Sequence, residues 1–161
     1  MKVGVVSDTH WQAADGPLPP ELFYELSGVD LILHAGDLVT IGILDQLTKI
    51  APVQAVAGNM DDDEIRKRLP AKRIVDIEKV RLGLIHGWGP PQGLPERVLR
   101  EFSEDVAVVI FGHSHQPYKE WIDGRLLFNP GNLLSDRFSK GRSYGLLTIE
   151  DQQVNGEIVM W

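Results

Sequence analysis

Short apolar runs rich in β-branched residues recur along the chain and predict buried strands. The early runs are separated by segments with a helical spacing of apolar residues, whereas the late runs are separated by turns such as Asp123-Gly124. The expected strands cover residues 2–6, 30–34, 53–57, 73–77, 80–85, 106–111, 118–122, 125–128, 143–149 and 154–161. The expected helices cover residues 21–27, 41–49, 62–69 and 95–102. This pattern predicts α/β layers, with one sheet or two facing sheets and with helices outside.

Composition narrows the class of protein. With 161 residues, 43% of them hydrophobic, the chain has the size and core of one folded domain, which we expect to span residues 1–161. The absence of cysteine excludes disulfides and thiolate zinc sites. No apolar run approaches the ~20 residues that span a membrane, and the N-terminus turns acidic too soon for a signal peptide, so we expect a cytoplasmic protein without a membrane partner. The formal net charge of −7 argues against a basic groove for nucleic acid.

Polar residues with metal-binding side chains follow one expected strand after another. In open α/β sheets, ligands bind beyond the carboxyl ends of the strands, so these side chains are expected to converge. They are seven in number and include four of the five histidines: Asp8, His10, Asp37, Asn59, His86, His113 and His115. Seven oxygen and nitrogen ligands are enough for two metal ions that share one bridging carboxylate.

Each of these residues, taken alone, has an ordinary structural explanation. Asp8, Asp37 and Asn59 suit the turns that follow strands, and His86 suits a loop. Only the closely spaced pair His113 and His115 favours a metal on its own. Taken together, however, potential metal ligands that follow one strand after another, in this order, predict a metal site.

The motifs that carry these residues resemble a known family. Their order is Asp-x-His, Gly-Asp, Gly-Asn, His-Gly and Gly-His-x-His, as in the calcineurin-like metallophosphoesterase superfamily. Within it, the segments Gly-Asn-Met-Asp, Gly-His-Ser-His-Gln-Pro and Asn-Pro-Gly are similar to those of the small YfcE-type phosphodiesterases. The resemblance covers nearly the whole chain and is far more specific for the superfamily than for a substrate.

The resemblance implies a fold and a set of ligands. The fold would be an α/β (α+β) arrangement, a two-sheet β-sandwich flanked by helices. One metal would be held by Asp8, His10, Asp37 and His115. The other would be held by Asp37, Asn59, His86 and His113, with Asp37 bridging and with Asn59 and His86 also positioning phosphate. Two divalent ions are implied, manganese first, with iron, zinc or nickel as alternatives that mixed N/O ligands also fit.

Two such cations would clamp a phosphoryl group and stabilise hydroxide between them, which then attacks in line and cleaves a P–O ester bond. The expected activity is therefore that of a phosphodiesterase acting on a small phosphate ester. One alternative is a non-catalytic interaction scaffold, as in the retromer subunit of this fold, although all seven positions here hold competent ligands. Another is a phosphomonoesterase or nuclease on the same metals, with long nucleic acid disfavoured by the acidic charge. Whether the protein forms a homo-oligomer is left open.

The sequence departs from the family at two places. Met60 stands where many relatives have a histidine thought to assist the leaving group, and Asn132 stands where serine is common. A methionine carries no titratable proton, so general-acid catalysis by this position is not expected.

A few further residues have assignments of their own. We expect His34 to be a core or supporting histidine, and the acidic run at residues 61–64 to begin a helix. Three aromatic residues are candidates for a pocket wall, with ordinary packing as the alternative: Trp11, Trp88 and Phe138. Arg142 is a weaker candidate for a phosphate contact.

Overall fold

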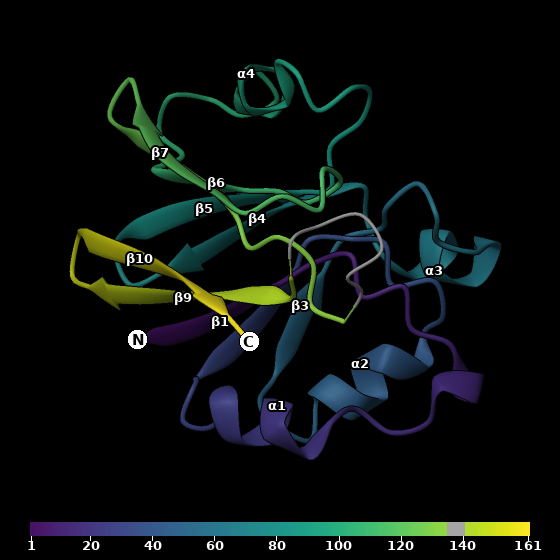
Figure 1. The fold of residues 1–161 in the computed structure, drawn as a ribbon. Helices are drawn as coiled ribbons and strands as arrows, with labels where there is room; N and C mark the ends of the chain where they lie inside the picture. Colours follow the sequence, from purple (N-terminus) through teal and green to yellow (C-terminus); the bar gives the residue numbers. More distant parts are fainter. Residues whose placement is uncertain (135–140) are drawn as a thin grey trace.

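Two five-stranded sheets face each other and short helices cover their outer faces (Figure 1). The computed structural model describes residues 1–134 and 141–161, and all statements below concern this part of the chain. The prediction of an α/β protein with a two-sheet sandwich and outer helices is confirmed.

The first sheet has the strand order β10-β9-β1-β2-β3. Its strands β1, β2 and β3 run parallel, whereas β9 lies antiparallel between β1 and β10. The bounds are Lys2–Val6 for β1, Leu31–His34 for β2, Val53–Ala55 for β3, Ser143–Glu150 for β9 and Gln153–Met160 for β10. The parallel strands therefore all end at the same edge.

The second sheet has the order β4-β5-β6-β8-β7, with β5, β6 and β8 parallel and with an antiparallel strand at each edge. The bounds are Lys72–Ile77 for β4, Val80–Ile85 for β5, Val108–Ile110 for β6, Tyr118–Ile122 for β7 and Arg125–Asn129 for β8. The helices are α1 at Pro20–Glu25, α2 at Gly42–Leu47, α3 at Asp63–Arg68 and α4 at Leu94–Leu99, with a 3₁₀ turn at Ala13–Asp15.

The central strands are buried on both faces. On β1, Val5 packs between the two sheets with residues such as Leu84 and Phe128, and Val6 points the other way, into the core under α1 and α2. A third core, which includes Val98 of α4, covers the outer face of the second sheet. Burial on both faces explains why these strands read as continuous apolar runs.

The expected elements exist, but several boundaries are wrong by up to three residues. The helix expected over residues 41–49 covers only Gly42–Leu47. Beyond this range, some backbone N–H groups bond to carbonyls only three residues back, so the chain continues as isolated turns. The strand expected over residues 53–57 ends at Ala55, since the N–H of Ala57 bonds to the carbonyl of Pro70.

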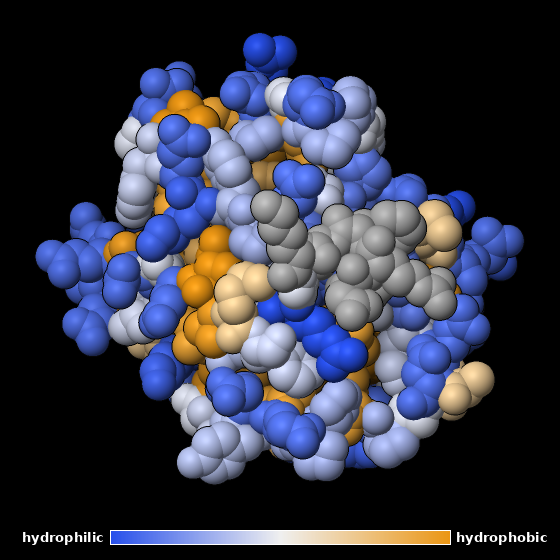
Figure 2. All heavy atoms as spheres, viewed as in Figure 1, coloured by the Kyte–Doolittle hydropathy of each residue, from blue (hydrophilic) through white to orange (hydrophobic). Residues whose placement is uncertain are grey.

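No helix in the described ranges is both long enough and apolar enough to cross a membrane. On the face seen in Figure 2, hydrophilic residues predominate and apolar ones show between them in separate patches.

Candidate metal centre

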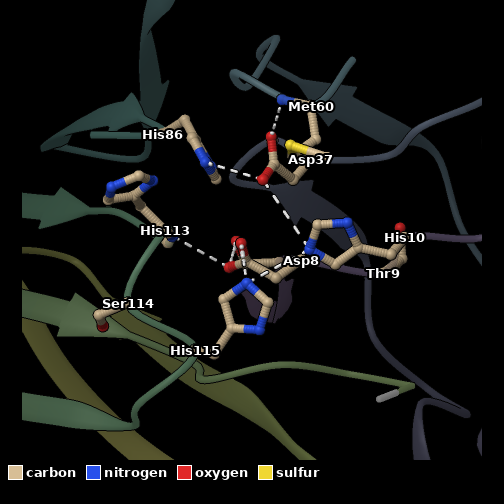
Figure 3. Close-up of polar contacts among 12 residues, drawn as sticks. Asp8, Thr9, His10, Asp37, Met60, His86, His113, Ser114 and His115 are labelled. Carbon is tan, nitrogen blue, oxygen red and sulfur yellow. Dashed lines mark hydrogen bonds and ion pairs between the residues drawn. The ribbon is translucent and has the colours of Figure 1, made fainter. Parts of the chain in front are cut away.

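The loops after β1, β2, β3, β5 and β6 meet between the two sheets and bring the seven predicted residues together. A continuous series of contacts connects their side chains. In Figure 3, the rings of His86 and His10 point toward the carboxylate of Asp37, and the ring of His115 points toward that of Asp8. The prediction that they converge is therefore met by the geometry, while their role as ligands stays a prediction.

Four of the seven form a first group whose potential ligand atoms lie within 4.8 Å of one another: Asp8, His10, Asp37 and His115. The Nε2 atoms of His10 and His115 are 3.3 Å apart, and Nε2 of His115 is 3.4 Å from Oδ1 of Asp8. Ligands ~2.0–2.2 Å from one tetrahedral ion lie about 3.3–3.6 Å from each other. These spacings therefore fit a single cation between the groups.

The other residues form a second group around Asn59. Oδ1 of Asn59 lies 3.1 Å from Nε2 of His86 and 3.0 Å from Nδ1 of His113. Nε2 of His86 also lies 3.3 Å from Oδ2 of Asp37, and that same oxygen lies 3.8 Å from Nε2 of His10 in the first group. Asp37 is thus the residue common to both groups.

Contacts with backbone carbonyls fix which ring nitrogen of His86 and of His113 faces Asn59. Nδ1 of His86 lies 2.8 Å from the carbonyl oxygen of Ala35, and Nε2 of His113 lies 2.8 Å from that of Gly89. A carbonyl only accepts, so these nitrogens carry the hydrogen, and the neutral ring keeps its lone pair on the opposite nitrogen. In the neutral form that a metal ion binds, both lone pairs would therefore be on the nitrogens that face Asn59.

Asp8 provides a direct test of whether a cation fits. Its Oδ2 accepts hydrogen bonds from the hydroxyl of Ser7 (2.6 Å) and from the backbone N–H of His113 (3.1 Å). Its Oδ1 is fully buried and receives no hydrogen bond from any described residue. A buried carboxylate oxygen without a donor is costly, and a cation beside His115 would satisfy it. The donor set and this orphaned oxygen therefore fit a divalent metal.

Burial and mutual contact shift the pKa values of the group strongly. Burial raises the pKa of Asp8 to about 7, against the opposing effects of His86 and Ser7. Burial by itself lowers the pKa of His86, but the contacts with Asp37 and the charge of Asp8 outweigh it and raise the pKa to about 9. Burial and the neighbouring His10 lower the pKa of His115 to about 4. A metal ion, which binds carboxylate and neutral imidazole, would compete with the protons on Asp8 and His86.

The backbone of the site is strained. Five of the seven residues have φ in the left-handed region: Asp8 (51°), His10 (45°), Asp37 (56°), His113 (71°) and His115 (57°). Such conformations cost about 1–3 kcal/mol each and persist where the surrounding structure holds them. Asp and His adopt this region more readily than most residues. The residue types therefore gave no indication that these φ angles are positive.

Two glycines allow the loops to approach this closely. A Cβ on Gly58 would lie 2.2 Å from Oδ1 of Asp37, and a Cβ on Gly112 would lie 1.9 Å from Oγ of Ser7. Any side chain at these positions would push the loops apart.

One supporting residue escaped the sequence analysis. Asp61, expected with its acidic neighbours at the start of a helix, is 3% exposed and accepts hydrogen bonds from the backbone N–H groups of Val39 (2.7 Å) and Gly58 (2.6 Å). It therefore fastens the loop of Asp37 to the loop of Asn59. The helix begins only with the residues after Asp61, because Asp62 caps α3 by accepting the N–H of Ile65 (2.8 Å).

His34 is fully buried, as expected, and is no member of the metal groups. Its Nδ1 accepts the N–H of Gly36 (3.2 Å), and its Nε2 lies 3.1 Å from Oγ1 of Thr9. It supports the loops that carry the site.

A cavity of about 1010 Å³ opens from the centre and includes His10, Asn59, His113 and His115 in its wall. Its volume is at the upper end of those that hold drug-sized ligands. Of the three aromatic candidates for its wall, Trp11 lines it, Trp88 is 46% exposed and is absent from the described lining, and Phe138 lies outside the described residues. Met60 and Arg142 also line it.

Comparisons with known proteins agree with this geometry. The family model of the calcineurin-like phosphoesterase superfamily domain matches residues 1–152. A probable metallophosphoesterase of Methanothermobacter thermautotrophicus is 37% identical over 161 residues, covering 99% of this chain and 92% of that protein. The phosphodiesterase YfcE of Escherichia coli is 29% identical, covering 91% of this chain and 87% of that protein.

A likeness of fold alone extends to Vps29 of Chaetomium thermophilum. Its crystal structure superposes with a TM-score of 0.79 at 22% identity, covering 99% of this chain and 97% of that chain. The match of the family model over most of the sequence, together with the fold, shows that the chain belongs to the calcineurin-like phosphoesterase superfamily.

Proposed function

We propose that this protein, as a single domain over residues 1–161, hydrolyses phosphodiesters with the help of two divalent metal ions. The observation that carries the proposal is the position of Oδ2 of Asp37, 3.8 Å from Nε2 of His10 and 3.3 Å from Nε2 of His86. One carboxylate oxygen thus faces the imidazoles of both groups, as a ligand shared by two ions would. Membership of the superfamily and the name of the relative YfcE support the choice of phosphodiesters.

Each ion would have four protein ligands. Asp8, His10, Asp37 and His115 would hold one. Asp37, Asn59, His86 and His113 would hold the other. When bound, two such ions supply positive charge that stabilises both the attacking and the leaving oxygen of the phosphoryl group and that acidifies water. Manganese is the first candidate, and iron, zinc and nickel also suit histidine with carboxylate ligands.

The residues have further roles of their own. Because Oδ1 of Asn59 faces His86 and His113, its amide nitrogen is left to donate a hydrogen bond to a phosphoryl oxygen. The carbonyl oxygens of Ala35 and Gly89 hold the rings of His86 and His113 in one orientation. These contacts would hold the two rings and the amide of Asn59 in place for a bound phosphoryl group.

The residue at position 60 cannot act as a general acid for the proposed leaving group. Met60 lines the cavity and is 58% exposed, but its thioether has no proton to give. The protein would therefore favour esters whose leaving oxygen departs without a proton, such as aryl diesters.

The proposal is tested by metal content and hydrolysis measured on the same preparation. The protein is stripped with a chelator, reloaded with manganese, iron, zinc or nickel in turn, and assayed with bis(para-nitrophenyl) phosphate and with para-nitrophenyl phosphate. We expect two ions per chain and hydrolysis of the diester that depends on them. Two bound ions without hydrolysis of either ester would favour an interaction scaffold, and a preference for the monoester would make the protein a phosphomonoesterase. The cytoplasmic location and the oligomeric state stay predictions.

A further inference from the structure

The cavity beside the metal centre contains a cation that the metal groups do not use. Of the described residues that line it, Arg142 is the only one with a permanent positive charge. It lies directly before β9 and is partly buried. The cavity is far larger than a phosphate group needs, so it has room for the arms of an ester beyond the metal ligands.

Arg142 differs from several basic residues on the surface. Arg68, Lys72, Lys79 and Arg81 each form an ion pair with a carboxylate. Within the described ranges, Arg142 has no carboxylate within ion-pair distance. Other described arginines, such as Arg97 and Arg125, also lack an ion pair, but their guanidinium groups donate to backbone carbonyls.

The contacts of Arg142 fix its guanidinium without using its donors. The guanidinium carbon lies 5.6 Å from the centre of the Trp161 ring, a cation–π distance. The backbone N–H of Trp161 also donates to the carbonyl of Arg142 at 3.0 Å, which ties the two residues together. The ring contacts the cation electrostatically, and the N–H donors of the guanidinium are left to form paired hydrogen bonds with an oxyanion.

The charge balance of the site leaves Arg142 without a counterpart when a simple phosphodiester is bound. In the proposed centre, the charges of two divalent ions face the carboxylates of Asp8 and Asp37 and a hydroxide, which leaves a single positive charge. A simple phosphodiester carries a single negative charge. A phosphodiester therefore neutralises the centre and leaves the guanidinium of Arg142, on a wall that also includes Asp15, as the partner for an additional anionic group.

We propose that Arg142 forms an anion subsite, which binds a carboxylate or phosphate on one ester arm of the substrate while the scissile phosphoryl group lies at the metal ligands. This inference rests on the proposed function and names its substrate class, a phosphodiester with a second anionic group. The subsite selects among esters and takes no part in bond cleavage.

The test uses three para-nitrophenyl diesters that share one leaving group. Their second arm ends in a methyl group, a carboxylate or a phosphate, so only the charge of the arm changes. We expect the metal-loaded protein to prefer the anionic arms in kcat/KM. Arg142→Met should lower kcat/KM for these arms by about 10- to 100-fold, the effect of a lost hydrogen bond between charged groups. The loss for the uncharged arm should be at least tenfold smaller.

Two further variants control for charge and for folding. Lys119→Met removes one positive charge outside the cavity, where the ammonium bonds to the carbonyl of Gly156 (3.0 Å), and should leave the preference intact. Arg142→Lys keeps the charge but not the paired donors, and should lie between the wild type and Arg142→Met. Thermal unfolding of each variant identifies any loss that comes from the contact with Trp161 alone.

Binding provides a readout that is independent of turnover. Calorimetry with the same three arms, each on a methyl phosphodiester that resists hydrolysis, measures the charge preference directly. Charge-selective binding that Arg142→Met abolishes would support the subsite even if no ester is hydrolysed, in which case the proposed phosphodiesterase activity fails. Hydrolysis of all three para-nitrophenyl esters without an effect of arm charge would overturn the subsite and leave the phosphodiesterase standing. An equal loss for all arms in Arg142→Met would also overturn it, because Arg142 would then serve the scissile phosphoryl group or the fold.

Discussion

Oδ2 of Asp37 lies 3.3 Å from Nε2 of His86, and both side chains are only 3% exposed. Burial favours the neutral carboxyl, but the hydrogen bond and charge of His86 outweigh this and lower the pKa of Asp37. The pair is therefore charged and dry in the absence of a cation. The same oxygen also faces His10, which makes this pair the point where the two proposed metal positions meet.

Asp37→Asn should lower occupancy at both metal positions, because one ligand serves two ions. Hydrolysis should fall by at least about 10²-fold, the upper end of losses seen when even a supporting residue of a metal site is changed. His10→Ala is the matched variant and should reduce occupancy mainly at one position. Elemental analysis of the reloaded proteins measures both effects. Loss of the same single ion in both variants would exclude a bridging role for Asp37.

Asp61→Ala should reduce both stability and metal affinity. It removes a buried carboxylate that holds two backbone N–H groups, at a cost of about 3–5 kcal/mol in the free energy of unfolding. Asp62→Ala, which removes the cap of α3, should cost about 1 kcal/mol and leave metal affinity unchanged. Denaturant unfolding and calorimetric metal titration separate the two. Equal effects of both variants would mean that Asp61 contributes no more than the helix cap and does not hold the loops of the site.

His34 should make the protein sensitive to acid. Burial lowers its pKa to about 3 in the folded protein, whereas the unfolded chain has a value near ~6.5. Between these values the unfolded state binds more protons, so the free energy of unfolding falls as the pH falls, by up to ~1.4 kcal/mol per pH unit. This contribution is complete above about pH 6.5 and is lost progressively below it.

His34→Asn is the variant for this prediction, since the new amide oxygen can still accept the N–H of Gly36. Its free energy of unfolding, measured by denaturant titration between about pH 4 and pH 8, should fall less steeply with acid than that of the wild type. Other titrating groups are common to both proteins and cancel in the difference. Parallel pH curves would show that His34 does not titrate on unfolding.

The Met60 protein should lose rate steeply as the leaving group becomes more basic. A positioned general acid contributes about 10²- to 10⁴-fold, and methionine cannot provide it. Met60→His should flatten this dependence, because the bond from the N–H of residue 60 to Oδ1 of Asp37 (2.8 Å) belongs to the backbone and survives the substitution. Met60→Leu controls for the change of shape.

The measurement is kcat/KM for a series of diesters with graded leaving-group pKa, at fixed metal occupancy. A shallow dependence already present in the Met60 protein would show that another group donates the proton. A new histidine that captures a metal would be recognised by a change in metal stoichiometry.

The sequence by itself determined the succession of strands and helices along the chain and the chemical types of the residues at the site. Apolar runs on β1 and β2 identify strands buried on both faces, and the residues that follow them, Asp8 and Asp37, identify the edge where ligands gather. Histidine, aspartate and asparagine in this order were sufficient to recognise the superfamily. These properties depend on neighbours close along the chain, which a sequence displays directly.

Only the tertiary structure determined the orientation of the side chains at the site. The carbonyl oxygens of Ala35 and Gly89 select the nitrogen that each histidine offers, and each lies more than twenty residues from the ring it contacts. The burial of Asp61 and the place of Arg142 on the cavity wall likewise depend on segments distant in sequence. Propensity and spacing report on local conformation, whereas hydrogen-bond partners and unpaired charges are set by packing between remote segments. For that reason the convergence of the seven candidate ligands was predictable from the sequence, and the residues that hold them and complete the cavity were not.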